Sequence, residues 1–163
     1  MLTETEKAYL AGFFDGDGCV NISVRQSQTH ATPSHYLQVI FSQCDQPFLE
    51  RWCEKVGMGR VYVNSGRPIG NKELWHWRLY DRQAEKMLKM MLPYLDIKKE
   101  QAEIALSFMR TKGRGGRRAT PAGLLHLREH YKDALSGMKR EDAELPKELH
   151  EYQQLLDSQL VLF

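Results

Sequence analysis

The sequence predicts an α+β fold in which a four-stranded antiparallel sheet carries helices on one face, followed by extra C-terminal helices. Two observations predict this class. Apolar residues recur in the order helix, strand, strand, helix, strand, strand, helix, and the strand-like segments alternate between apolar and polar residues. The 163 residues fit a single domain spanning 1–163, and 42% hydrophobic with 27% charged residues is ordinary for a globular protein.

The first element is a helix over residues 3–15. Thr3 and Glu6 have the spacing of a capping box, in which each side chain binds the backbone N–H of the other residue. Gly16 and Gly18 are expected to end the helix at that point, because glycine disfavours a continued helix.

Four later segments show the two-residue alternation of half-buried strands. These predicted strands cover residues 19–25, 36–42, 60–64 and 75–79. The other segments have helical spacing, with Pro47 suited to a first helical turn and Pro93 ending a helix. The predicted helices cover residues 47–55, 83–92, 98–109, 122–135 and 146–156, the last two in a C-terminal extension of residues 120–163.

The alternation predicts one apolar face of the sheet and one face rich in Asn, Ser, Arg, Gln, Tyr and His. Long hydrogen-bonding side chains with little Asp or Glu suit a surface that meets the edges of DNA bases. The alternative is a solvated sheet face that binds nothing. Trp75 and Trp77 share the apolar side with Leu79, which favours a place in the core over base stacking.

The net charge of +2 hides an uneven distribution of charge along the chain. Basic residues gather in segments 60–82 and 110–118, whereas the chain is acidic from residue 141 onward. Basic segments of this kind can follow the phosphates of a nucleic acid. Alternatively, they are solvated loops.

Cysteine usage and hydropathy exclude several classes of protein. Cys19, Cys44 and Cys53 are too few and too irregularly spaced for a zinc site or a disulfide framework. No apolar run approaches the roughly 20 residues that cross a bilayer, and the first residues are too polar for a signal peptide. We therefore expect a soluble intracellular protein without a membrane partner, in a bacterial or archaeal cytoplasm or in an organelle.

Residues 10–18, with the sequence LAGFFDGDG, place a glycine-flanked carboxylate, Asp17, at the end of the first predicted helix. Small residues on this helix would let a second helix approach closely: Ala8, Ala11 and Gly12. Two such helices would bring two Asp17 carboxylates together, and these could bind a hard cation with the Gly16 carbonyl groups. Turn chemistry is the alternative for the DGDG segment. An EF-hand is excluded because its third oxygen position and distant Glu are lacking.

This segment resembles the LAGLIDADG signature of homing endonucleases, and the helix and following strand stand where that family has them. The motif occurs once, so the chain resembles the single-motif branch, whose members work as homodimers. The resemblance implies that Asp17 is catalytic and binds Mg²⁺ together with Gly16. Mn²⁺ is expected to substitute, and Ca²⁺ to bind without supporting cleavage. Ala8, Ala11 and Gly12 would form the dimer interface.

Two further catalytic residues follow from the same resemblance. Gln43, at the end of the second predicted strand, would orient water. Lys98, in the segment PYLDIKKEQA of residues 93–102, would stabilise charge near the scissile phosphate. Without the resemblance these would be a strand-end amide and a solvated helix residue. One position departs from the family, because Pro47 stands where a basic residue is frequent, and Arg51 is the candidate replacement one helical turn later.

The resemblance also places the outward face of the strands in the major groove of double-stranded DNA, where arginine would contact guanine and amide side chains adenine. The expected contact residues are Asn21, Ser23, Arg25, Gln26, Gln28, Tyr36, Gln38, Tyr62, Asn64, Arg67, His76 and Arg78. The residues expected to contact backbone phosphates are Arg114, Arg117, Arg118, Lys139 and Arg140.

These inferences predict a site-specific homing endonuclease that makes a double-strand break in a long pseudo-palindromic DNA site by metal-dependent hydrolysis, in support of intron or intein mobility. One alternative is a catalytically inactive relative, either an RNA maturase that binds its parent intron RNA or a DNA-binding regulator. Another is an unrelated α+β structural or interaction protein, which would be monomeric and would not bind DNA.

Overall fold

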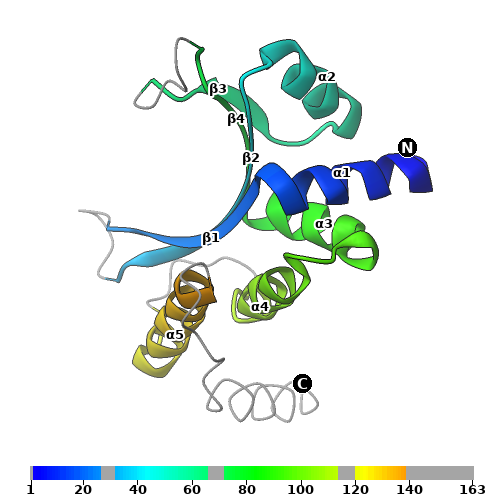
Figure 1. Cartoon of the computed structure of the whole chain (residues 1–163). Coiled ribbons are helices and arrows are strands. Elements are labelled where there is room, and N and C mark those ends of the chain that lie inside the picture. Colours follow the sequence, from blue (N-terminus) through cyan, green and yellow to red (C-terminus); the bar gives the residue numbers. More distant parts are fainter. Residues whose placement is uncertain (1, 27–31, 66–71, 114–119, 139–163) are drawn as a thin grey trace.

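The computed structural model describes residues 2–26, 32–65, 72–113 and 120–138, which Figure 1 shows in colour. Within these residues an antiparallel sheet lies against helices, which confirms the predicted class and the predicted order of elements. The strands are β1 (Gly18–Arg25), β2 (Ser34–Gln43), β3 (Arg60–Val63) and β4 (Trp75–Tyr80). The helices are α1 (Glu4–Asp17), α2 (Gln46–Val56), α3 (Asp81–Met91), η1 (Leu92–Tyr94, a 3-10 helix), α4 (Lys99–Arg110) and α5 (Ala122–Met138). None of the described helices is long and apolar enough to span a membrane.

The strands of the described sheet lie in the order β1-β2-β4-β3, and each pairs antiparallel with its neighbours. The sheet is curved, with the helices on its convex side and its concave side open toward the left of Figure 1. Strands twist because of backbone sterics, and an antiparallel sheet can pack one face on a core while the other face meets solvent. The concave face is therefore the surface that the fold leaves available to a ligand.

The convex face of the sheet builds the core, since alternate residues of each strand point toward the helices. Leu37 and Phe41 of β2 and Trp77 of β4 are fully buried. The ring of Phe41 stacks on Trp77 at 4.8 Å between centroids and meets Phe14 of α1 at 5.2 Å. The Trp77 indole N–H donates to the Met58 carbonyl at 2.8 Å. The predicted place of Trp77 in the core is confirmed, and Trp75 lies half-buried beside it.

The capping box that starts α1 is confirmed. The backbone N–H of Glu6 donates to Thr3 Oγ1 at 3.3 Å, and the N–H of Thr3 donates to Glu6 Oε2 at 2.9 Å. The predicted end of this helix is two residues short, because α1 continues through Gly16 to Asp17. Glycine costs only about 1 kcal/mol in a helix, so the added backbone hydrogen bonds outweigh it.

The apolar residues of β3 are less buried than the sequence predicts. Val61 is half-buried and Val63 is 43% exposed. The reason is that β3 is a short edge strand of the described sheet, flanked by β4 alone. The predicted helix over residues 146–156 lies outside the described residues.

A polar cluster ties α5 and the end of α4 to the sheet. The buried Arg128 guanidinium donates to the Thr111 carbonyl at 2.6 Å and to its hydroxyl at 3.2 Å. The Lys112 ammonium donates to the His35 carbonyl at 2.9 Å and to the Asp81 carboxylate at 2.5 Å. Because hydrogen bonds to charged groups are stronger than neutral ones, this cluster fixes α5 against the sheet.

Candidate active site and nucleic-acid interface

α1 brings Asp17 to the surface where the helix passes into β1. Gly16 and Asp17 are both exposed and form the last turn of α1, where carbonyl groups lack helical partners. That turn contains no basic residue, and a carboxylate is electrostatically unfavourable at a helix C-terminus. The stability of α1 therefore does not explain an aspartate at this position.

Gly18 permits the abrupt change from helix to strand. A Cβ atom at this position would lie 2.0 Å from Cδ2 of Phe14 and 2.5 Å from its carbonyl oxygen. Gly18 has φ −83° and ψ 158°, which any residue can adopt, so the need for glycine arises from the close approach of Phe14.

The substitution Gly18→Ala is expected to lower the free energy of unfolding by about 1–3 kcal/mol, because the added methyl group overpacks the junction against Phe14. Urea denaturation measures this change. Gly123→Ala in α5 is the matched control, since a Cβ there meets nothing within 4 Å, and it should leave stability unchanged or slightly raised. Equal losses in the two variants would contradict the steric role of Gly18.

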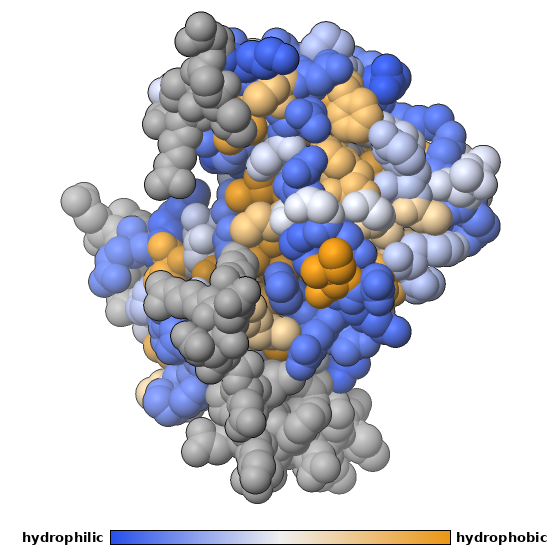
Figure 2. All heavy atoms as spheres, viewed as in Figure 1, coloured by the Kyte–Doolittle hydropathy of each residue, from blue (hydrophilic) through white to orange (hydrophobic). Residues whose placement is uncertain are grey.

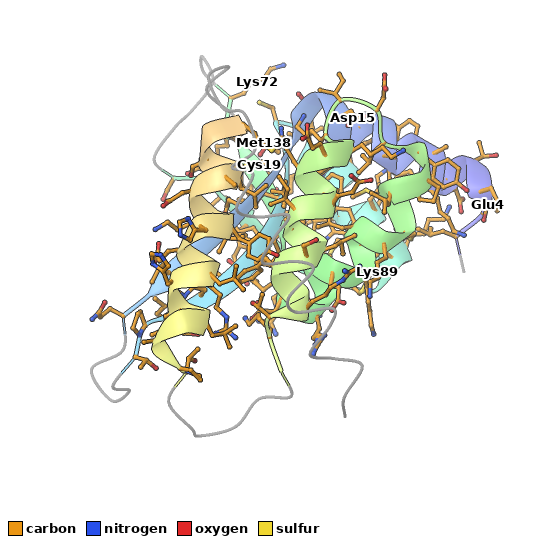
Figure 3. The ribbon with its side chains drawn as sticks, turned by 90° about the horizontal axis from the view of Figure 1, so that it is seen from below. Glu4, Asp15, Cys19, Lys72, Lys89 and Met138 are labelled. Atoms are coloured by element: carbon orange, nitrogen blue, oxygen red, sulfur yellow. The ribbon has the colours of Figure 1, made fainter. Side chains whose placement is uncertain are left out.

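Asp15 holds Lys98 beside the end of α1. The Asp15 carboxylate accepts hydrogen bonds from the backbone N–H groups of Asp96 and Lys98, each at 2.9 Å. The Lys98 ammonium donates to the backbone carbonyl of Asp15, two residues before Asp17. Figure 3 shows Asp15 beside the N-terminal end of α4. The structure thus joins two parts of the predicted site, and Asp15 is a residue that sequence reasoning did not single out.

Asp15→Asn should destabilise the protein by about 1–3 kcal/mol, since an amide replaces a charged acceptor of two backbone N–H groups. Because Asp15 positions Lys98, which the sequence predicts to act in DNA cleavage, the variant is also expected to cleave DNA more slowly with unchanged DNA affinity. Asp96→Asn is the control, because that side chain is exposed in the same turn. A variant that lost stability but kept the wild-type cleavage rate would show that Asp15 is structural only.

Gln43 lies at the same end of the sheet as Asp17. Gly18 pairs with Phe41, so Asp17 and Gln43 each extend just beyond the last pair of β1 and β2. The Gln43 Oε1 atom accepts the N–H of Cys44 at 2.8 Å. The side chain lines a cavity of about 590 Å³, together with Asp45, Gln46, Pro47, Lys72, Glu73, Trp75 and Cys44. Arg51, the candidate basic replacement, is exposed with its guanidinium over the Phe48 ring at 5.5 Å.

The exposed face of α1 carries small residues up to its end. Ala8, Gly12 and Gly16 recur at four-residue spacing, all three are exposed, and a Cβ at either glycine would meet nothing within 4 Å. Ala11 differs from the expectation, since it is fully buried in the core of this chain and cannot contribute to an exposed face. Tyr9 borders this stripe of small residues; its side chain is 52% exposed and stacks on Trp52. In Figure 2, pale and orange residues gather in the middle of this view, where α1 crosses, with blue residues around them.

The concave face of the sheet carries the polar residues predicted to contact DNA. Opposed residues of antiparallel strands share a face, so the register places Asn21 beside Gln38, Ser23 beside Tyr36, and Tyr62 beside His76. The register adds residues that were not predicted: Cys19, Ile40, Ser42, Arg60 and Tyr80. None of the strand residues on this face is Asp or Glu. Arg25, Arg60 and Arg78 give the face a positive charge.

Side chains on the concave face contact one another through hydrogen bonds and a cation-π interaction. Arg78 donates to His76 Nδ1 at 3.1 Å, and the other ring nitrogen of His76 lies 3.2 Å from Asn64 Nδ2. The Arg78 guanidinium also lies 5.9 Å from the Tyr62 ring centroid. Burial, assisted by the charge of Arg78, lowers the pKa of His76, so its ring is neutral at pH 7. The buried Nε of Arg78 has no hydrogen-bond partner among the described residues.

Several predicted contact residues lie outside the described residues and stay predictions. They are Gln28, Arg67, Arg114, Arg117, Arg118, Lys139 and Arg140. Gln26 is described and is exposed at the end of β1.

The donor atoms at the end of α1 fit a hard divalent cation. The carboxylate of Asp17 and the carbonyl of Gly16 are oxygen ligands of the type that Mg²⁺ and Ca²⁺ prefer. Within the described part of the chain, no three His, Cys, Asp or Glu side chains lie together as a metal cluster.

Comparison with known proteins places the chain in a family. The sequence model described as LAGLIDADG endonuclease matches residues 10–108. The structure is similar to that of the homing endonuclease I-CvuI, solved in complex with a DNA target, with 19% identity, a TM-score of 0.69, and coverage of 96% of this chain and 95% of the other. It is also similar to the archaeal intron-encoded homing endonuclease I-Vdi141I, solved with DNA, with 16% identity, a TM-score of 0.69, and coverage of 95% and 96%. No curated protein sequence matches.

The family match spans more than half of the chain and begins within the segment that ends in Asp17. The fold of both similar structures agrees with it over almost their whole length. The chain belongs to the LAGLIDADG endonuclease family.

Proposed function

We propose that this chain is a site-specific DNA endonuclease that acts as a homodimer and makes a double-strand break in a long pseudo-palindromic site by metal-dependent hydrolysis. The observation that carries the proposal is the end of α1. There an exposed Asp17 follows an exposed stripe of small residues, and Asp15, two residues earlier, holds Lys98.

The small residues Ala8, Gly12 and Gly16 support a close approach of two α1 helices. Without side chains beyond a methyl group, their backbones can come together around a twofold axis. Since Asp17 ends the same helix, two copies would meet near that axis. Each copy would then present its own concave sheet face to one half of the DNA site.

The residues near Asp17 have separate roles in hydrolysis. Asp17 and the Gly16 carbonyl would hold Mg²⁺, which stabilises the charge that develops on phosphate oxygens during an in-line displacement. The similar I-CvuI has been solved with DNA in the presence of 2 mM Mg and, separately, 2 mM Ca. Lys98 would place its ammonium near the scissile phosphate, and Gln43 would orient the attacking water.

The concave face would read base edges in the major groove. Arg78 would contact guanine through its guanidinium, and Gln38 would contact adenine through its amide. His76, whose Nδ1 accepts from Arg78, would hold that guanidinium in place for the contact. Each of these contacts would occur twice, once in each half-site.

Selection from a randomised duplex library tests the proposal. The wild-type protein is incubated with the library and Mg²⁺, and the cleaved molecules are sequenced. We expect the recovered sites to be pseudo-palindromic, with both strands cut at a fixed offset about the centre. Binding of the parent intron RNA without any DNA cleavage would overturn the proposal in favour of a maturase. A monomer without DNA affinity would overturn it in favour of a structural protein.

A further inference from the structure

Two histidines on α5 face each other one helical turn apart, far in the sequence from Asp17. The Nε2 atoms of His126 and His130 lie 3.0 Å apart, and their rings are 4.4 Å apart between centroids at an interplanar angle of 81°. The opposite side of α5 is the packed side, where Leu127, Tyr131 and Leu135 are buried. Figure 3 shows α5 lying alongside α4, with side chains projecting from its far side.

The spacing of these two nitrogens matches that of two ligands on one metal ion. Imidazole nitrogens bind Zn²⁺ at about 2.0–2.1 Å, so two of them on one ion lie about 2.9–3.4 Å apart in cis-octahedral, square-planar or tetrahedral geometry. The two nitrogens are joined by a hydrogen bond of 3.0 Å, a length that falls in this interval. Imidazole suits Zn²⁺, Ni²⁺ and Cu²⁺, whereas Mg²⁺ prefers oxygen ligands.

We propose that His126 and His130 form a chelating site for a divalent transition metal such as Zn²⁺ or Ni²⁺, separate from the oxygen-lined site at Asp17. A metal ion would bind the two Nε2 atoms, with water completing its coordination. Chelation would link two successive turns of α5 and so stabilise that helix in the folded protein.

The neighbouring Glu129 decides what kind of site this is. The sequence His126-Leu-Arg-Glu129-His130 has the H-x-x-E-H pattern of one class of zinc hydrolases, in which the glutamate serves as a general base. Here Glu129 Oε1 accepts a hydrogen bond from His35 Nε2 at 2.8 Å, and its other oxygen pairs with the Lys132 ammonium. These contacts, the one with Lys132 first, lower the pKa of Glu129. A carboxylate held in this way is not free to take a proton from water, so the site binds metal and does not catalyse hydrolysis.

Calorimetric titration of the full chain with Zn²⁺ and with Ni²⁺ tests this site. Chelation strengthens binding by about 10²–10⁴-fold over one ligand, because the second ligand binds intramolecularly. We therefore expect His126→Gln and His130→Gln each to weaken the binding of both metals by at least about 10²-fold. Circular dichroism should show that both variants fold, since the two rings lie on the outward side of α5.

A spacing variant provides the matched control. The double substitution His130→Gln with Asp133→His keeps two histidines on the same exposed side but separates them by two turns, about 10 Å along the axis. It should bind as weakly as His130→Gln alone. The inference is overturned if this variant or either single variant binds Zn²⁺ and Ni²⁺ as tightly as the wild type. Asp17→Asn should bind Zn²⁺ and Ni²⁺ at the two histidines as tightly as the wild type. Failure of the histidine site is therefore distinguishable from failure of the nuclease proposal.

Discussion

Asp17→Asn is expected to reduce DNA cleavage by about 10³-fold or more while DNA binding and folding are kept. The amide has the size of the carboxylate but lacks its charge, so it binds Mg²⁺ poorly. A metal ion contributes several kcal/mol of charge stabilisation to the transition state, and each 1.36 kcal/mol corresponds to a factor of ten in rate. Because Asp17 is exposed at the negative end of α1, its neutralisation should even raise stability slightly.

Single-turnover cleavage of the selected DNA site, followed by gel electrophoresis, measures this loss, and a gel-shift assay in Ca²⁺ measures binding. Asp133→Asn makes the same chemical change at an exposed position of α5 and should cleave at the wild-type rate. Undiminished cleavage by Asp17→Asn would refute its assigned role.

The second large effect is expected for Gly12→Leu, which should dissociate the proposed dimer. Overpacking costs about 1–3 kcal/mol per site, so two copies at one interface would lose about 2–6 kcal/mol, a factor of about 30 to 10⁴ in the dissociation constant. Within one protomer the new side chain meets open space, and leucine is a better helix former than glycine. The monomer should therefore stay folded, with no loss of helicity.

Light scattering across a concentration series measures the oligomeric state of this variant, and cleavage should fall in parallel. Gly123→Leu is the control, because Gly123 is likewise helical, exposed and surrounded by open space, but lies on α5. If Gly12→Leu remained a dimer of wild-type affinity, the face of α1 that bears Ala8 and Gly16 would not be the interface.

The strands could be predicted from the sequence because their alternation is regular. Leu37 and Phe41 in β2 and Trp77 in β4 each fall on the side that the period of two assigns to them, and all are buried. The capping box of Thr3 and Glu6 is similarly local, since both partners lie within one turn. Features that depend only on residues close together in the sequence can therefore be predicted from the sequence.

Features that depend on distant segments could not be predicted in this way. Ala11 is a small residue like Gly12, but only the packing of α1 on the sheet shows that it is buried. Asp15 has its partners, Asp96 and Lys98, more than 80 residues away. One local feature was also missed: His35 points inward, because β2 begins at Ser34, two residues before the predicted start. Extending the alternation backward by those two residues would have found it.

A crystal structure of the protein on its selected DNA site, with Ca²⁺ in place of Mg²⁺, most directly tests how the site is assembled. We predict two protomers with their α1 helices in contact through Gly12, and metal ions bound by Asp17 of both copies next to the scissile phosphates. Protomers that met through another surface, leaving each Asp17 alone in solvent, would contradict the proposed active site.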